Sequence, residues 1–192
     1  MDKPRNSVDL AVESTPIKDI LYGQINQITE SRILQEISSK NHSKIINEIL
    51  TRCIPIISKL DGDDFEIFGT FAESMMHYLL TNALIPSQRK ITIKNTEVDI
   101  VIPDSRALDA SPKDALILFF AKTTDHNIIT KHLKKLQKVQ PIKENIWMIS
   151  KSKLDTPYKT YEIENISTIL DNINDFLNSK KQSKFRIFKT KL

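Results

Sequence analysis

The chain has 192 residues, of which 40% are hydrophobic and 27% are charged. These proportions are typical of a soluble globular protein, and the length suffices for one ordinary domain with additional helices. No apolar run reaches the roughly 20 residues of a membrane-spanning helix, and no secretory signal is evident. A single cysteine excludes an intramolecular disulfide, and three glycines exclude a glycine-rich phosphate loop. We therefore expect a cytoplasmic protein without a membrane anchor.

The net charge of +4 is distributed unevenly. Residues 180–192 contain six lysines and arginines and no acidic residue. Subtracting these six from the 28 basic residues leaves 22 against 24 acidic residues, a net charge of −2 for the rest of the chain. A basic tail over 179–192 favours contact with nucleic acid or an acidic partner, and Lys184 and Arg186 are its candidate contacts with nucleic acid. A tail without a binding role stays an alternative.

The first third of the chain is read as an arm followed by helices. Residues 1–16 are polar and aperiodic, which predicts a disordered arm. Residues 17–60 carry apolar residues at helical spacing and predict an N-terminal helical extension. Pro55 predicts the end of the last of these helices, or a bend in it. Such helices either pack on a core or bind a protein partner, and both roles stay open.

The remaining elements alternate between helix and strand. We expect a helix over 65–82, strands over 88–93 and 97–102, a loop over 105–112, a strand over 115–121, a helix ending near 139, strands over 145–150 and 161–163, and a helix over 167–177. The tight connection between the first two strands predicts an antiparallel pair. The apolar third strand, its helix and the next strand predict a parallel crossover. The sequence thus predicts an α/β domain over 61–178, with a mixed central sheet flanked by helices.

Three polar side chains are candidates for chemistry, and for the first of them, an acid in mid-strand, burial is costly unless the acid is exposed, paired or bound to a metal. Asp99 lies in mid-strand, where alternation places Val98, Ile100 and Ile102 on the opposite face. Lys122 follows the most apolar strand of the chain, and Glu73 lies within a helix. Each has a plain alternative: a solvated strand face for Asp99, a strand end that reaches water for Lys122, and a solvated helix face for Glu73.

The order of these residues resembles that of the PD-(D/E)xK nuclease superfamily, which includes restriction-type endonucleases and archaeal Holliday-junction resolvases. The resemblance covers residues 65 to 150 approximately and implies a restriction-endonuclease-like fold. It also implies that Glu73 and Asp99 hold Mg²⁺ or Mn²⁺. Lys122 would then be the catalytic lysine, which orients the attacking water or stabilises charge at the phosphate. Magnesium prefers oxygen ligands, and a lysine beside it adds positive charge where negative charge develops.

One position departs from the family pattern. The second strand acid, two residues before the lysine, is replaced by Phe120, which cannot bind a metal. Glu97 and His77 are candidates to compensate, whereas Asp114 is expected to be too distant. Without compensation the site is degenerate. The resemblance therefore leaves two functions open. One is a nucleic-acid-binding protein, which as an enzyme would be a metal-dependent DNA endonuclease in repair, recombination or defence. The other is a catalytically inactive nuclease-like scaffold that acts as a protein-interaction module.

The helix after Lys122 carries a lysine-rich face. At 100° per residue, four lysines fall within an arc of roughly 100°: Lys131, Lys134, Lys135 and Lys138. Their opposite side is apolar and would pack on the sheet. We expect these lysines to contact nucleic acid, DNA rather than RNA, although a solvated helix face is the plain alternative. Because junction-cutting relatives usually act as dimers, the resemblance also implies a homodimer.

Overall fold

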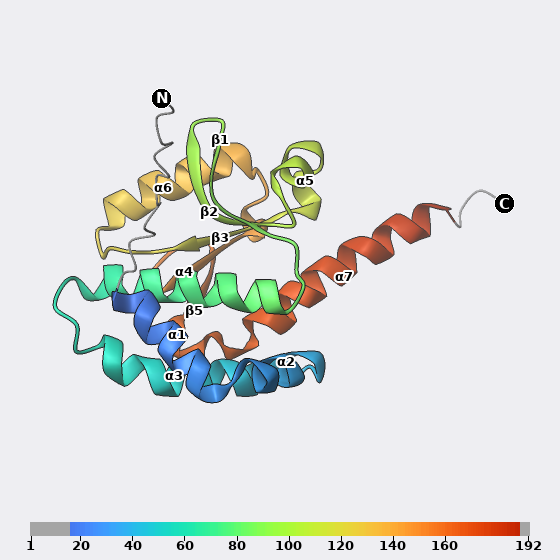
Figure 1. Cartoon of the computed structure of the whole chain (residues 1–192). Helices are drawn as coiled ribbons and strands as arrows, with labels where there is room; N and C mark the ends of the chain where they lie inside the picture. The colour runs from blue at the N-terminus through green and yellow to red at the C-terminus, as the bar shows by residue number, and fades with distance from the viewer. Residues whose placement is uncertain (1–15, 189–192) are drawn as a thin grey trace, which may run out of the picture.

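Five strands form one mixed sheet that helices cover on both faces (Figure 1). The computed structural model describes the backbone of residues 16–188 and the side chains of residues 16–180. The expected arm, apart from Pro16, lies outside the described residues, as do the side chains of Lys184 and Arg186. The expected α/β fold with a mixed central sheet and flanking helices is confirmed. Among the described helices, none is long and apolar enough to cross a membrane.

The sheet has the strand order β1-β2-β3-β4-β5. Its strands are β1 (Gln88–Ile93), β2 (Thr96–Ile102), β3 (Leu116–Phe120), β4 (Ile146–Ser150) and β5 (Lys159–Glu162). The first three strands pair antiparallel, and β3, β4 and β5 pair parallel. Positive φ angles at Lys94 and Asn95 form the tight β1–β2 turn, as expected for a two-residue hairpin connection. The predicted antiparallel pair and parallel crossover are both confirmed.

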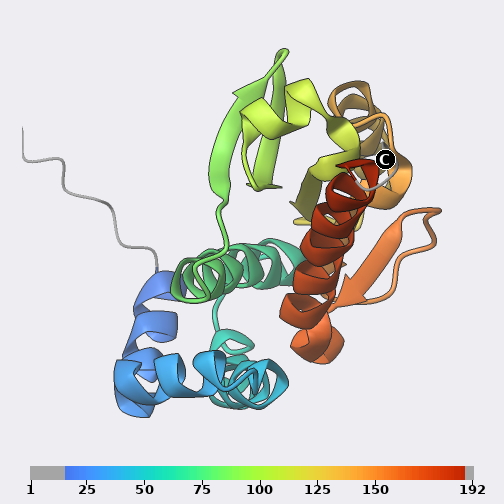
Figure 2. The ribbon, with the colours of Figure 1, turned by 90° about the vertical axis from the view of Figure 1, so that its right-hand side faces the viewer.

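One face of the sheet is covered by most of the helices (Figures 1 and 2). These are α1 (Pro16–Ile28), α2 (Glu30–Ser38), α3 (His42–Ile57), α4 (Asp64–Asn82) and α7 (Ile169–Phe188). The helix α4 lies directly on the sheet, and α1 to α3 form a further layer beneath it. Pro55 lies inside α3, which ends two residues later. The buried side chains of all five helices and the sheet form one continuous core on this face, the α4 side.

The other face is covered by α6 (His126–Val139) and, near the hairpin, by α5 (Ser105–Ala110). The Asp125 carboxylate caps α6 by accepting from the N–H groups of Asn127 and Ile128. A second core lies between α6 and the sheet, and its members include Ile117, Phe119 and Met148 together with the apolar side of the helix. We call this face the α6 side.

Two helix predictions are wrong. A loop was expected over residues 105–112, but α5 forms there because Asp104 accepts a hydrogen bond from the N–H of Ala107. Such a short helix lacks the apolar periodicity that reveals longer ones. The last helix was expected to end at Leu177, but α7 continues to Phe188. Its added turns leave the body of the protein, so no apolar repeat is required there (Figure 1).

The β1–β2 hairpin contains an irregular step at Lys90 and Asp99. Pairing between the two strands skips these residues, although their neighbours on both sides are paired. Those neighbouring pairs are Arg89 with Ile100 and Ile91 with Val98. Lys90 has a φ of 50°, in the left-handed region that side-chain-bearing residues seldom adopt.

Both strands change face across this step. Ile100 and Ile102 pack in the core of the α4 side, whereas Val98 packs in the core of the α6 side. The prediction that these three residues share one face is therefore wrong. It assumed strict alternation along the strand, which holds only where the backbone stays in the extended region.

Candidate functional site

Glu73 is a fully buried carboxylate in the middle of α4. Its Oε2 accepts a hydrogen bond from Nζ of Lys122 at 2.7 Å, and its Oε1 accepts one from Nε of Arg89 at 2.7 Å. A third cation, Lys90, places Nζ 3.8 Å from Oε1. Both oxygens of Glu73 are therefore bonded to side-chain cations. The plain alternative of a solvated helix face is wrong.

Lys122 reaches Glu73 because α4 and the end of β3 approach very closely at Gly69. A methyl group at Gly69 would lie 2.7 Å from Cγ of Lys122 and 2.9 Å from the carbonyl oxygen of Ala121. Only glycine permits this approach without a shift of the backbone. Gly69 lies one helical turn before Glu73 on α4, and its lack of a side chain lets Lys122 pass over it to reach the glutamate. The sequence analysis did not identify Gly69.

Asp99 lies where β2 and β3 separate. The last pair between these strands joins Ile100 to Leu118, and beyond it Oδ2 of Asp99 accepts the N–H of Phe120 at 2.9 Å. The Asp99 carboxylate thus takes the place of the β2 carbonyl group that would otherwise accept this N–H between the two strands. The charges of Glu73 and Lys122 both act on Asp99, so the structure brings together the three candidate catalytic residues.

The two carboxylates are tuned in opposite directions. Burial raises the pKa of Asp99 to about 6, while the Phe120 N–H bond and the charge of Lys122 work against this rise. Burial also works to raise the pKa of Glu73, but the hydrogen bonds and charges of Lys122 and Arg89 outweigh it and hold that pKa below its usual value. Glu73 is therefore the permanent anion of the group that we call the Glu73 cluster, which consists of Glu73, Asp99, Arg89, Lys90 and Lys122.

Arg89 and Lys90 were missed by sequence reasoning. Regular alternation along β1 would place Arg89 with Ile91, which packs against the core of the α6 side. The irregular step at Lys90 instead turns Arg89 toward Glu73 on the α4 side. The available signal was that Arg89 shares the alternation of the apolar residues of its strand. An arginine that points into the core requires a buried anion.

None of the residues expected to compensate for the missing acid is arranged to do so. Phe120 is buried in the core of the α4 side and contributes only its backbone N–H to the cluster. Glu97 is exposed and acts on α6 instead, where burial and the charge of Lys135 lower the pKa of His132 and the charge of Glu97 works against them. Asp114 precedes β3, at the opposite end of that strand from Lys122, as expected.

His77 lies one turn beyond Glu73 on α4. Burial and the charge of Arg89 lower its pKa, against the smaller effect of Glu73. Within the described structure no hydrogen bond joins His77 to Glu73, and its buried Nδ1 has no hydrogen-bond partner. His77 therefore does not complete the ligand set.

The four lysines of α6 are exposed and line a shallow hollow of about 560 Å³ together with His126, Asn127 and Thr130. They form no ion pair with the described side chains. The helix α6, which carries these lysines, covers the face of the sheet opposite to that covered by α4, which carries Glu73 (Figure 1). The expectation of an exposed lysine face is confirmed, but this face and the carboxylate cluster do not converge.

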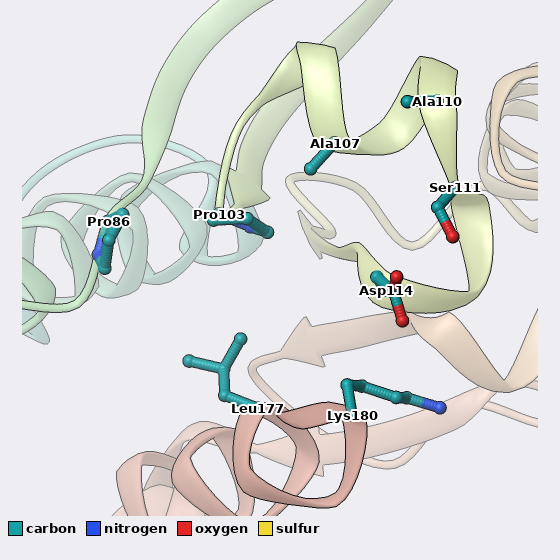
Figure 3. A pocket seen from close by; sticks show the side chains of 8 residues that line it. All are labelled: Pro86, Pro103, Ala107, Ala110, Ser111, Asp114, Leu177 and Lys180. Carbon is teal, nitrogen blue, oxygen red and sulfur yellow. The ribbon is translucent and has the colours of Figure 1, made fainter. Parts of the chain in front are cut away.

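A separate cavity of about 350 Å³ lies between α5 and α7 (Figure 3). Its lining is largely apolar, and includes Pro86, Pro103, Ala107 and Leu177. Asp114 and Lys180 provide its charged groups. The cavity shares no residue with the Glu73 cluster, so it is not part of the candidate site.

Comparison with solved structures finds a likeness to the restriction endonuclease PspGI in a complex with substrate DNA. The TM-score is 0.57, the identity is 12%, and the match covers 86% of this chain and 94% of that chain. The fold is restriction-endonuclease-like. No family model matches the sequence, and no curated protein matches it. The likeness therefore establishes the fold and leaves the site to be judged on its own chemistry.

The donor set of this restriction-endonuclease-like fold does not fit a divalent metal in its present arrangement. Mg²⁺ requires oxygen ligands that are free to bind it. Both Glu73 oxygens are engaged by cations, Oδ2 of Asp99 accepts a backbone N–H, and the side chain of Phe120 offers no oxygen. Among the described residues, no group of three histidine, cysteine or acidic side chains could hold a metal ion. Metal binding by Glu73 and Asp99 stays a prediction.

Proposed function

We propose that this chain is a nucleic-acid-binding protein whose preferred ligand is DNA. The observation that carries the proposal is the likeness to a restriction endonuclease solved with its substrate DNA, over 86% of this chain. The fold alone does not determine function, so the proposal also needs groups that recognise phosphates. The exposed lysines of α6 and the cations around Glu73 are such groups.

Binding of this kind is electrostatic in origin. Lysines that neutralise phosphates release condensed counterions, and the affinity then falls steeply as salt is added. We infer backbone contacts by Lys131, Lys134, Lys135 and Lys138, with further contacts by Lys184 and Arg186 of the basic tail. Such contacts carry no sequence information, so the expected binding is tolerant of sequence.

A second candidate function is a DNA endonuclease that requires Mg²⁺ or Mn²⁺. The convergence of Glu73, Asp99 and Lys122 favours it, because the resemblance assigns catalysis to these three positions. The engaged oxygens of Glu73 and the apolar Phe120 oppose it. The preferred alternative is therefore a fold retained for binding.

One experiment tests both functions. The purified protein is mixed with labelled single-stranded, duplex and branched DNA in Mg²⁺, Mn²⁺ or EDTA, beside an Asp99→Ala variant. Salt-sensitive complexes without cleavage are the expected result. Metal-dependent cleavage that disappears in Asp99→Ala would establish the endonuclease, and the absence of any complex at low salt would reject nucleic-acid binding.

The remaining expectations concern partners and location. We propose a homodimer, because the resemblance includes junction-cutting proteins that act as dimers, and light scattering after size exclusion tests it. A monomer mass with and without DNA would reject it. The helices α1 to α3 and the basic tail are the proposed surfaces for a protein partner, and a cytoplasmic location agrees with a DNA ligand.

A further inference from the structure

Three cations converge on the single buried carboxylate of Glu73. The exposed fraction of the side chain is 0% for Glu73, 18% for Arg89, 35% for Lys122 and 62% for Lys90. The anion is therefore sealed inside, while the cations extend from it toward solvent. This arrangement places positive charge at the surface, where the buried Glu73 carboxylate fixes its position.

The backbone of Lys90 is distorted in the way that this convergence requires. Neighbouring residues of a regular strand point to opposite faces of the sheet. Arg89 and Lys90 are neighbours, yet both approach Oε1 of Glu73, and the left-handed φ of 50° at Lys90 accompanies this departure. Unfavourable backbone conformations persist where the surrounding structure enforces them, and they concentrate at functional sites.

The charges of the cluster do not balance. Arg89, Lys90 and Lys122 contribute three positive charges, and Glu73 and Asp99 contribute two negative charges when both are ionised, which leaves a net charge of +1. A divalent metal would add two further positive charges to this excess. A phosphodiester carries one negative charge and would neutralise it, and lysine and arginine N–H groups are the donors that phosphate oxygens accept.

We propose that Lys90, Lys122 and Arg89 form a metal-independent binding site for a phosphate of the nucleic-acid backbone, with Glu73 as the buried counter-ion that holds the three cations in position. This proposal rests on the proposed function. It specifies where the DNA backbone binds and that binding there does not require a metal ion. The side-chain cations take the place that the family resemblance gives to magnesium.

The chain offers a matched pair of lysines to test the site. Lys40 is exposed and has a φ of 59°, close to that of Lys90, but it lies between α2 and α3. Alanine at either position removes one charge at a similar backbone conformation. The measurement is fluorescence anisotropy with a labelled DNA duplex at several salt concentrations, in Mg²⁺ and in EDTA at equal ionic strength.

The expected result is that Lys90→Ala weakens binding and lowers the slope of log affinity against log salt by about one, as for the loss of one phosphate contact. Lys40→Ala is expected to leave both quantities unchanged, and the wild type to bind no more tightly in Mg²⁺ than in EDTA. Equal effects of the two substitutions, or binding that depends on Mg²⁺, would overturn the site while leaving nucleic-acid binding intact. Failure of the wild type to bind would overturn both proposals.

Metal binding is measured separately, so that the result does not depend on DNA. The free-ion signal of Mn²⁺ in electron paramagnetic resonance is titrated with the wild-type protein and with Glu73→Gln. Retention of the free-ion signal at protein concentrations near that of the ion is expected for both. A stoichiometric loss of signal with the wild type that Glu73→Gln abolishes would overturn the proposal.

Discussion

The two faces of the sheet use lysine in different ways. On the α4 side, Lys122 is fixed by a 2.7 Å bond to a fully buried glutamate and by the close passage of Gly69. On the α6 side, the four lysines of α6 project into solvent without an ion pair to the described side chains. One face therefore has cations bonded to an internal anion, and the other has solvent-exposed cations on a helix surface.

This difference predicts different consequences of substitution. Removing one partner of a buried ion pair is destabilising because it leaves the other charge uncompensated, whereas exposed lysines contribute mainly to long-range attraction and on-rate. Substitutions on the α4 side should therefore change stability and binding together. Substitutions on the α6 side should change binding alone.

The largest expected effect is that of Glu73→Gln. Removing the buried charge leaves Arg89 and Lys122 without their anion, and we expect a loss of about 3–5 kcal/mol in the free energy of unfolding. The measurement is chemical denaturation monitored by circular dichroism. Glu48→Gln is the control, because Glu48 also receives bonds from two arginines, Arg32 and Arg52, but its side chain is 19% exposed and both arginines are more exposed still.

At Glu48 the expected loss is about 1 kcal/mol or less, as for exposed ion pairs. Equal losses at the two glutamates would show that the burial of Glu73 does not increase its contribution to the free energy of unfolding. The distinction between cations held by a buried anion and exposed cations would then be wrong.

The next effect is a pH dependence carried by Asp99. The folded state raises the pKa of this carboxyl from 3.8 to about 6, so the folded state binds the proton more tightly than the unfolded state does. The stability from this group is therefore fully present below pH 4 and is lost as the pH rises through 6. Two units of pKa correspond to roughly 3 kcal/mol.

The measurement is the free energy of unfolding from pH 4 to pH 7, for the wild type and for Asp99→Asn. The variant cannot titrate, so the difference between the two curves should change by that amount in this window, with the wild type losing stability toward pH 7. Parallel curves would mean that Asp99 titrates normally and is not buried in the cluster.

The sequence predicted most of the fold because its elements follow local rules. The strand over 88–93 and the helix over 126–139 have regular apolar spacing and identifiable ends, such as the cap at Asp125. The short helix α5 and the last turns of α7 escaped prediction because neither has an apolar repeat. Periodicity detects elements that bury a face and misses those that do not.

The candidate site was predictable in part. Glu73, Asp99 and Lys122 were identified from order and context, and the structure brings them together. Arg89 and Lys90 were not identified, because both depend on a left-handed residue that reverses the faces of the strand. Such a step is decided by tertiary contacts between α4 and the hairpin and leaves no periodic signal in the sequence.

A smaller effect is expected at Gly69, which sets the distance between α4 and β3. Gly69→Ala forces a methyl group against Cγ of Lys122 and the backbone of Ala121, and we expect a loss of about 1–3 kcal/mol in stability, as for other overpacked positions. Weaker DNA binding should accompany it, because Lys122 is displaced. Thermal unfolding and anisotropy measure the two effects.

Gly23→Ala in α1 is the matched control, because nothing lies within 4 Å of its added methyl group. Alanine is the better helix former, so this variant should gain about 0.5–1 kcal/mol. A gain at both glycines would show that the approach of α4 to β3 is looser than the contact distances imply.

The smallest effect on stability is expected from substitutions on the α6 side. There the predicted effects on stability and on DNA binding differ most. Lys131→Ala combined with Lys135→Ala should change the free energy of unfolding by less than about 0.5 kcal/mol, since neither lysine has a described ion-pair partner. The same double variant should lower the salt slope of DNA binding by about two, one for each lost phosphate contact. An unchanged slope would assign the nucleic-acid surface to the α4 side alone. A large loss of stability would instead show that these lysines are structural, and the distinction between the two faces would no longer hold.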